Sequence, residues 1–355
     1  MNQFYNLLKT AREANASDLH LVTGTPPFMR VNGEIIIMNY ESLTPIKIRN
    51  MLMEVIREDQ LKRFEVEREL CLAFSLPDIG YFRVSLYYHR GNMEAAIRLG
   101  IFEIKSFEEL GLPPILVELS RKVSGLLLIT GATGMGKTTT FNAIIDFINR
   151  ERRCKIITIE DPVEYIHTPI KSIIVQQEAY TDAKSFSRAL VHILRQNPDI
   201  IGVGEMRDLE TISTTLTAAE TGHLVIATLH TIDAASSVDR IIDVFPPHQQ
   251  EQIRYQLASV LLAVICQRLL PRADKKGRVL ATEVLIANDA VRNVIKEKKT
   301  NQIDNIIRTS AAQHMQSMDE VIKDLYMRGL ITYDVAVSAA KNPRMFDRLI
   351  GGIGR

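Results

Sequence analysis

The stretch LLLITGATGMGKTTTFNAII, residues 126–145, decides how the rest of the chain is interpreted. An apolar run leads into a turn with three glycines, followed by Lys137, three threonines and apolar residues at helical spacing. Residues 131–138, GATGMGKT, fit the pattern G-x-x-x-x-G-K-[ST], between a predicted strand and a predicted helix as that pattern requires. The stretch therefore predicts a loop that binds the phosphates of a nucleotide rather than a plain glycine-rich turn.

The residue types in this loop match the chemistry of phosphate binding. Glycine lets the backbone approach phosphate without a Cβ clash, and the start of a helix supplies free N–H groups and a positive dipole end. We expect Lys137 to reach the β- and γ-phosphates and the Thr138 hydroxyl to bind Mg²⁺. The residues expected to contact ATP are Gly131, Ala132, Thr133, Gly134, Met135, Gly136, Lys137, Thr138 and Thr139.

From about residue 120 onward, short apolar runs alternate with helical segments. The runs GLLLIT, KIITI, DIIGVG and HLVIATLH lack polar alternation, which is typical of parallel strands covered on both faces. This order predicts a doubly wound α/β unit. After GRVLATEVLI the pattern predicts several short helices, such as residues 291–299 and 318–327.

The first hundred residues predict a small α+β unit. Asn32 and Gly33 stand between two apolar runs, which is a hairpin signal, and Thr44-Pro45 begins a predicted helix. Three predicted strands follow, LCLAFSL, YFRVSLYYH and MEAAIRLG. We place an N-terminal domain at 1–106, a linker at 107–119, and an α/β domain with C-terminal helices at 120–355.

Composition restricts the class of protein. The 355 residues suggest two domains, and 43 basic against 42 acidic residues give no overall attraction to nucleic acid or anionic lipid. The three cysteines are far apart, which favours a reduced intracellular setting over a zinc or disulfide framework. No signal peptide is visible, and the apolar segment 257–266 is shorter than the roughly 20 residues that a membrane span needs. We expect a soluble protein.

Acidic residues after two predicted strands could complete a site for nucleotide hydrolysis. Glu205 lies at the carboxyl end of DIIGVG, the usual place for a metal-associated acid, although Gly204 replaces the customary aspartate. Glu160, Asp161 and Glu164 follow KIITI, where three acids around a proline indicate a bound cation or a proton transfer; a solvated acidic loop is the alternative. Spacing alone leaves the choice of base between Glu160 and Glu164 open.

Two histidines bracket the strand in TGHLVIATLHT. His230 falls at its carboxyl end, where ligands bind in open α/β sheets, so it could donate a hydrogen bond to the γ-phosphate. For His223, at the other end, a structural role competes equally with a functional one. Asp199 begins its strand, and we expect it to act as a cap or turn residue.

Taken together, these motifs resemble the secretion ATPase superfamily, and within it the PilT-like type IV pilus retraction ATPases. The similarity extends over almost the whole chain. ASDLHLVTGTPPFMRVNGEI is similar to the N-terminal signature of the family, and GATGMGKTTT to its Walker A loop. ITIEDPVEYIH resembles the Asp box, LRQNPDIIGVGEMRD the Walker B segment, TGHLVIATLHT the His box, and AVRNVIKEKKTNQI the C-terminal motif of the retraction branch.

The resemblance implies a fold, an activity and partners. Each subunit would pair a PAS-like N-terminal domain with a RecA-like ATPase domain, bind ATP between them, and work as part of a homo-hexameric, ATP-hydrolysing motor for pilus retraction and twitching motility. The motor would be cytoplasmic, peripheral at the inner face of the cytoplasmic membrane, with an inner-membrane pilus platform protein as partner and no nucleic acid.

The resemblance also implies roles for single residues. Glu164 of the Asp box would be the general base, and Glu205 would act on the Mg²⁺ side together with Thr138. Arg83 and Arg98 of the N-terminal domain would reach the phosphates, where a guanidinium stabilises charge on the transferred phosphoryl group. The sequence departs from the family pattern at Met135, where serine is usual, and we expect that side chain to point away from phosphate.

The sequence also leaves several alternative functions to be considered. Pilus-assembly and type II secretion ATPases usually carry an extra N-terminal domain and a tetracysteine zinc element; this sequence begins at the short N-terminal unit and has no cysteine pair, which favours retraction. An accessory retraction paralogue is a second alternative, since VRNVIKEKK deviates from the retraction motif. A nucleic-acid translocase would need a basic, aromatic strand channel, and a scaffold would bind ATP without driving work.

Overall fold

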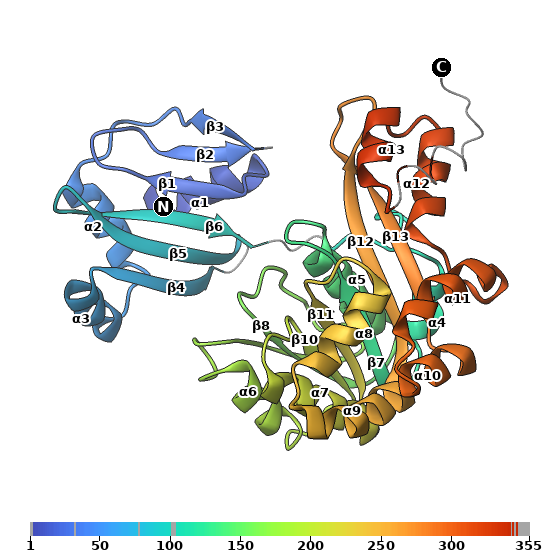
Figure 1. Ribbon diagram of the computed structural model, residues 1–355. Helices are drawn as coiled ribbons and strands as arrows, with labels where there is room; N and C mark the ends of the chain where they lie inside the picture. Colours follow the sequence, from blue (N-terminus) through green and yellow to red (C-terminus); the bar gives the residue numbers. More distant parts are fainter. Residues whose placement is uncertain are drawn as a thin grey trace. The chain divides into compact units, whose positions relative to one another are not determined.

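The computed structural model describes residues 3–31, 33–76, 79–100, 104–341, 343 and 346 (Figure 1). The chain divides into two compact units, which are described one at a time. The first consists of Met1–Glu103 with Glu164–Ile166, and the second of Ile104–Val163 with His167–Arg355.

The first unit is a six-stranded antiparallel sheet with strand order β3-β2-β1-β6-β5-β4. Its core lies between the sheet and the helices, because Phe4, Leu7, Leu8 and Ala11 of α1 recur at helical spacing and are all buried. The elements are α1 (Gln3–Glu13), β1 (Asp18–Leu21), β2 (Phe28–Val31), β3 (Glu34–Ile37), α2 (Pro45–Met53), α3 (Glu58–Glu67), β4 (Glu69–Leu76), β5 (Gly80–His89) and β6 (Asn92–Leu99).

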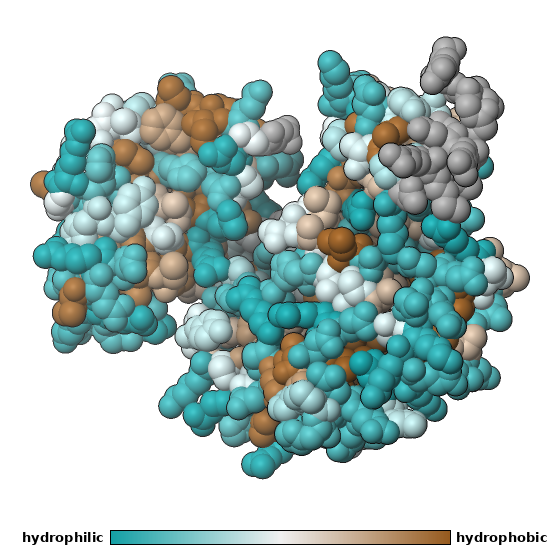
Figure 2. All heavy atoms as spheres, viewed as in Figure 1, coloured by the Kyte–Doolittle hydropathy of each residue, from teal (hydrophilic) through white to brown (hydrophobic). Residues whose placement is uncertain are grey.

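Most of the elements expected in this unit are present. The hairpin predicted around residues 32–33 is formed by β2 and β3, with Gly33 at a φ of 90°, while Asn32 lies outside the described residues. Thr44 caps α2 by accepting the N–H of Lys47 at 3.3 Å. The helix α3 has no counterpart among the expected elements. Figure 2 shows hydrophobic side chains near β2 and β3, where residues 35–37 of the edge strand are exposed isoleucines.

The second unit is a seven-stranded sheet with strand order β13-β12-β7-β11-β10-β8-β9, parallel except for the edge strand β13. The four apolar runs expected as parallel strands are β7, β8, β10 and β11. The strands are β7 (Gly125–Thr130), β8 (Lys155–Glu160), β9 (Ile173–Glu178), β10 (Ile200–Val203), β11 (Leu224–Leu229), β12 (Leu261–Pro271) and β13 (Arg278–Ile286).

Helices cover both faces of this sheet, which explains the continuous apolar runs. One face packs against α4 and α5, and the other against α6 to α10 and α11. These helices are α4 (Ile115–Ser120), α5 (Lys137–Glu151), α6 (Phe186–Ile193), α7 (Leu209–Glu220), α8 (Ala234–Asp243), α9 (Pro247–Val260), α10 (Asp289–Lys296) and α11 (Ile303–Thr309), with a 3₁₀ turn η1 (Thr300–Gln302). The apolar segment 257–266 is divided between the end of α9 and the start of β12.

The C-terminal helices pack on the β12–β13 hairpin. Leu270 and Ala281 of the hairpin share a buried cluster with Ile322, Ala336 and Phe346. The elements here are η2 (Ala311–Gln313), α12 (Met318–Met327) and α13 (Tyr333–Ala339), and α10 and α12 match the two helices expected in this region. In the part of the chain that the structure describes, no helix is long and apolar enough to cross a membrane.

The segment 107–119, expected as a linker, packs instead as part of the second unit. Phe107, Leu112, Leu116 and Leu119 are buried in the same cluster as residues of β7 and α5. The apolar side chains of this segment therefore cover one face of the sheet, which a free linker would not do.

The contact between α5 and β10 leaves no room for a side chain at Gly202. A Cβ there would lie 2.7 Å from both Phe141 Cζ and Thr158 Cγ2. We expect Gly202→Ala to lower the free energy of unfolding by about 1 to 3 kcal/mol through overpacking, measured by urea denaturation. Combining it with Phe141→Leu should recover part of the loss; a double variant that is no more stable than Gly202→Ala would contradict this cause.

Candidate active site

The phosphate-binding loop predicted from the sequence joins β7 to α5. Gly136 precedes α5 with a φ of 85° and, having no side chain, makes no side-chain cap; the start of a helix is a favourable place for an anion. Gly131 begins the loop with a φ of 145°, and a Cβ there would lie 2.6 Å from the carbonyl oxygen of Gln267 on β12. The loop thus passes so close to β12 that residue 131 must be glycine.

Lys137 is the first residue of α5, and its side chain folds back over the loop. The Nζ donates to the carbonyl oxygens of Gly131 at 2.7 Å and Ala132 at 3.0 Å, and lies 3.4 Å from Nδ1 of His230. Burial lowers the pKa of Lys137, and the negative charge of Glu205 opposes that shift. The ammonium group therefore lies among the loop, His230 and Glu205.

His230 follows β11 directly, at the carboxyl edge of the parallel sheet. Its Nε2 lies 3.0 Å from Oε1 of Glu205, and its Nδ1 is also 3.4 Å from the Thr133 hydroxyl. Because an ammonium group can only donate, Nδ1 accepts from Lys137 and Nε2 carries the proton that Glu205 accepts. The histidine thus connects the loop lysine to the carboxylate.

Glu205 comes two residues after β10, and its two oxygens have different partners. Oε1 faces His230, and Oε2 accepts from Nη2 of Arg207 at 2.7 Å. Burial raises the pKa of Glu205, but the hydrogen bonds from Arg207 and His230 and the charge of Arg207 outweigh it, so that the pKa is below its ordinary value. The carboxylate is therefore ionised at neutral pH.

Arg207 is a site residue that the sequence analysis missed. Besides its bond to Glu205, its Nη1 lies 4.0 Å from Oδ2 of Asp161. A positive residue two positions after the acid of GEMRD was the available signal, but an exposed arginine in a loop is usually a solvated surface charge. The role of Arg207 becomes visible only in the structure, where the ends of β8 and β10 lie side by side and Arg207 contacts an acid after each strand.

The acidic segment after β8 places its members in different surroundings. Glu160 is 3% exposed and accepts from the Thr158 hydroxyl at 2.7 Å and from Gln176 Nε2 at 3.2 Å. Asp161 precedes a cis peptide bond to Pro162 and is exposed. Glu164 is grouped with the first unit. Glu160 and Asp161 therefore differ in exposure, although they are neighbours in the sequence.

The two N-terminal arginines lie on adjacent strands, since Arg83 of β5 is paired with Arg98 of β6. Arg98 donates through Nε to Oδ1 of Asp18 at 3.2 Å, while its side chain stays 66% exposed. Burial raises the pKa of Glu164, and the charges of Arg98 and Arg83 oppose the shift. That these arginines reach the phosphates stays a prediction.

The oxygen donors on the second unit fit a magnesium ion. Mg²⁺ prefers oxygen ligands and usually binds through one or two protein groups together with phosphates and water. Thr138, in the first turn of α5, and the ionised Glu205 supply a hydroxyl and a carboxylate of that kind. No group of three or more metal-binding side chains occurs among the described residues, so a protein-only metal cage is not formed there.

Three further residues have structural contacts. Asp199 accepts the N–H of Lys155, the first residue of the neighbouring strand β8, at 2.7 Å. His223 Nδ1 bonds to the carbonyl oxygen of Ala218 at 2.9 Å at the end of α7. The sulfur of Met135 accepts the N–H of Leu269 at 3.3 Å, so this side chain faces β12.

Comparisons with known proteins show which family the chain belongs to. The family model described as "Type II/IV secretion system protein" matches residues 93–338. The chain belongs to this family. It is 41% identical to a twitching motility protein of Neisseria gonorrhoeae over 95% of this chain and 90% of the relative. It is 40% identical to the type IV pilus retraction ATPase PilT of Pseudomonas aeruginosa over 96% and 98% of the two chains.

A solved structure gives the same result. The crystal structure of the pilus retraction motor PilT with bound ADP matches with a TM-score of 0.89 and 43% identity, covering 98% of this chain and 99% of that one. The chain is therefore a PilT-like, nucleotide-binding ATPase. The fold class is confirmed too: an N-terminal α+β domain is followed by a RecA-like domain with C-terminal helices.

The contact between Arg207 and Glu205 predicts a change in the pH dependence of this PilT-like ATPase. Arg207→Gln removes the hydrogen bond that lowers the pKa of Glu205 most, so that the pKa should rise and the acid limb of ATP turnover should move to higher pH. Turnover measured between pH 5 and 9 would check this.

Arg150→Gln is the matched control, because Arg150 forms an exposed i,i+4 pair with Asp146 on α5. We expect its pH profile to match the wild type. An unshifted acid limb in Arg207→Gln would contradict the assignment of Arg207 to Glu205.

Proposed function

We propose that this chain hydrolyses ATP to drive type IV pilus retraction, with Lys137, His230 and Glu205 at the centre of its phosphate site. One observation carries the proposal. These three side chains come from the ends of different segments and form one chain of contacts beside the loop, with distances of 3.4 Å and 3.0 Å. A plain glycine-rich turn would have no use for a buried lysine next to an ionised carboxylate.

Each group of the site has a distinct role in this proposal. The N–H groups of residues 131–139 and Lys137 bind the β- and γ-phosphates, and His230 contacts the γ-phosphate end. Thr138 and Glu205 hold Mg²⁺. A magnesium ion so placed would neutralise charge on the phosphates. Arg207 keeps Glu205 ionised and fixes one of its oxygens.

Glu164 is the proposed general base. Its competitor Glu160 is buried and accepts hydrogen bonds from Thr158 and Gln176, which leaves it poorly suited to bind a water molecule. Burial raises the pKa of Glu164. A carboxylate whose pKa is closer to neutral pH is a better general base. Arg83 and Arg98 would stabilise charge on the transferred phosphoryl group.

The assembly proposed is a cytoplasmic homo-hexamer at the inner face of the membrane, whose platform partner is an inner-membrane pilus protein. Family resemblance supports this arrangement. Hydrolysis in successive subunits would change their conformation and turn phosphate release into movement.

A second candidate is an accessory retraction motor. The chain is 38% identical to the type IV pilus ATPase PilU of Pseudomonas aeruginosa over 95% of this chain and 88% of that protein, close to the value for PilT. The chain can be expressed in cells that lack PilT and in cells that lack PilU. Restored twitching in the first would support a main retraction motor, and restored twitching only in the second would support an accessory motor.

Substituting the base tests the chemistry. Glu164→Gln should lower the kcat of ATP hydrolysis by about 10²- to 10⁴-fold, because it removes the proton acceptor, while ATP binding is retained. Glu160→Gln is the comparison, and we expect a much smaller loss. If the loss is larger in Glu160→Gln at equal protein stability, the assignment of the base is wrong.

The dependence of turnover on protein concentration tests the ring. If neighbouring subunits complete each site, ATP turnover per subunit should rise steeply with concentration and level off where sizing shows hexamers. Equal turnover per subunit in monomeric and hexameric fractions would contradict the proposed assembly.

A further inference from the structure

The loop that follows His230 leads straight into α8, whose first turn is fixed by acidic side chains. Asp233 caps α8, because its Oδ1 accepts the N–H of Ser236 at 2.7 Å. The N–H of Ala234 donates to Oε1 of Glu283 on β13 at 2.9 Å. The segment that begins at His230 therefore ends at a helix start held by two carboxylates.

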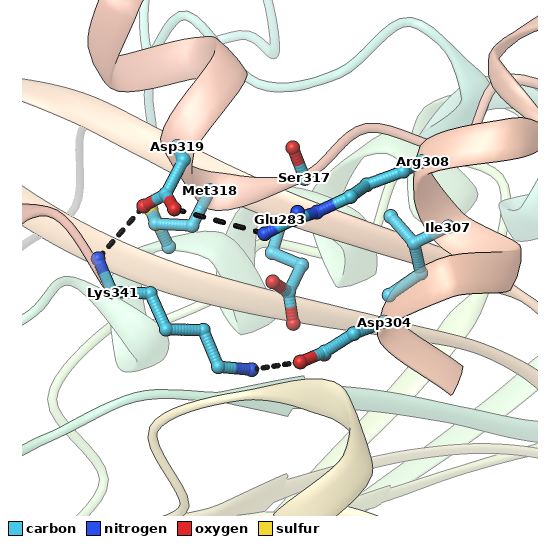
Figure 3. A pocket seen from close by; sticks show the side chains of 8 residues that line it. All are labelled: Glu283, Asp304, Ile307, Arg308, Ser317, Met318, Asp319 and Lys341. Atoms are coloured by element: carbon cyan, nitrogen blue, oxygen red, sulfur yellow. Dashed lines mark hydrogen bonds and ion pairs between the residues drawn. The ribbon is translucent and has the colours of Figure 1, made fainter. Parts of the chain in front are cut away.

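Lys341 brings the C-terminal part of the chain to this helix start. It lies two residues after α13, and its Nζ is 2.6 Å from Oδ2 of Asp304 on α11 and 3.4 Å from Oδ2 of Asp233. Its backbone N–H donates to Oδ1 of Asp319 on α12 at 2.7 Å. Figure 3 shows Lys341 beside Asp304 and Asp319, with Glu283 in the same pocket.

The ammonium group of Lys341 compensates the negative charges of the carboxylates around it. Asp233, Glu283 and Asp304 repel one another, and Lys341 attracts all three. Burial lowers the pKa of Lys341, but the hydrogen bond to Asp304 and the three negative charges outweigh it, so that the pKa is raised. Removing one partner from such a half-buried set leaves uncompensated charge, which is more disruptive than losing a surface ion pair.

We propose that Lys341 is a positioning residue for ATP hydrolysis, which couples the C-terminal helices to His230 by holding Asp233 at the start of α8. The inference rests on the proposed role of His230 at the phosphate site. Asp233 is only three positions after His230 in the chain, so a movement of the C-terminal helices would be passed to His230 through Asp233. By linkage, the nucleotide bound at the loop would also affect the C-terminal segment.

Replacing the ammonium group tests this proposal. Lys341→Met should lower the kcat of ATP hydrolysis about ten- to a hundredfold with little change in KM, because the phosphate loop itself stays intact. Lys341→Arg should restore most of the rate. Lys323→Met is the matched control, since Lys323 of α12 forms no ion pair within the described part of the chain. Melting temperatures of all variants show whether each assay is made on folded protein.

A double variant locates the effect. In a His230→Asn background, Lys341→Met should cost no further activity if it acts through His230. Independent losses that multiply in the double variant would overturn the coupling. An unchanged kcat in Lys341→Met, or a loss that Lys341→Arg does not rescue, would overturn it too.

Should Lys341→Met fail to fold, Asp304→Asn weakens the same ion pair and should give the same non-additive loss. His230→Asn alone tests the proposed function: full turnover there would refute the role of His230, whatever the lysine variants show.

Discussion

Parallel strands that end at the same edge of a sheet bring distant residues together, and the site of this protein depends on that constraint. Lys137 follows β7, Glu205 follows β10 and His230 follows β11. The lysine and the histidine are 93 residues apart in the chain and 3.4 Å apart in space. Because β11 lies between β7 and β10, His230 stands between the loop lysine and the carboxylate and can contact both.

The same constraint explains what could be predicted from the sequence. The loop and Glu205 were recognisable because each follows a short apolar run, which is typical of a buried strand. Ligand-binding residues of open α/β sheets lie at the carboxyl ends of such strands. Arg207 could not be recognised in this way, because its importance comes from two acidic segments that meet only after the sheet has formed. Sequence spacing also could not separate Glu160 from Glu164, whereas burial and hydrogen bonds distinguish their surroundings.

The fold, too, could be predicted in part from the sequence. The alternation of strands and helices predicted the doubly wound unit, and α3 was missed because its ten residues bury only Phe64 and so show little apolar periodicity. The segment 107–119 was interpreted as a linker, yet its apolar residues Phe107, Leu112, Leu116 and Leu119 pack against one face of the sheet. Lys341 is a third example: an unremarkable lysine near the C-terminus gains its meaning from carboxylates on α8, β13 and α11.

We infer that the loop between β7 and α5 holds the phosphates during ATP hydrolysis. Phosphate release by the purified protein with and without the substitution Lys137→Gln tests it most directly, together with the affinity for a fluorescent ATP analogue. We expect Lys137→Gln to lose turnover and to bind the analogue more weakly, at an unchanged melting temperature. Hydrolysis by Lys137→Gln at the wild-type rate would contradict it.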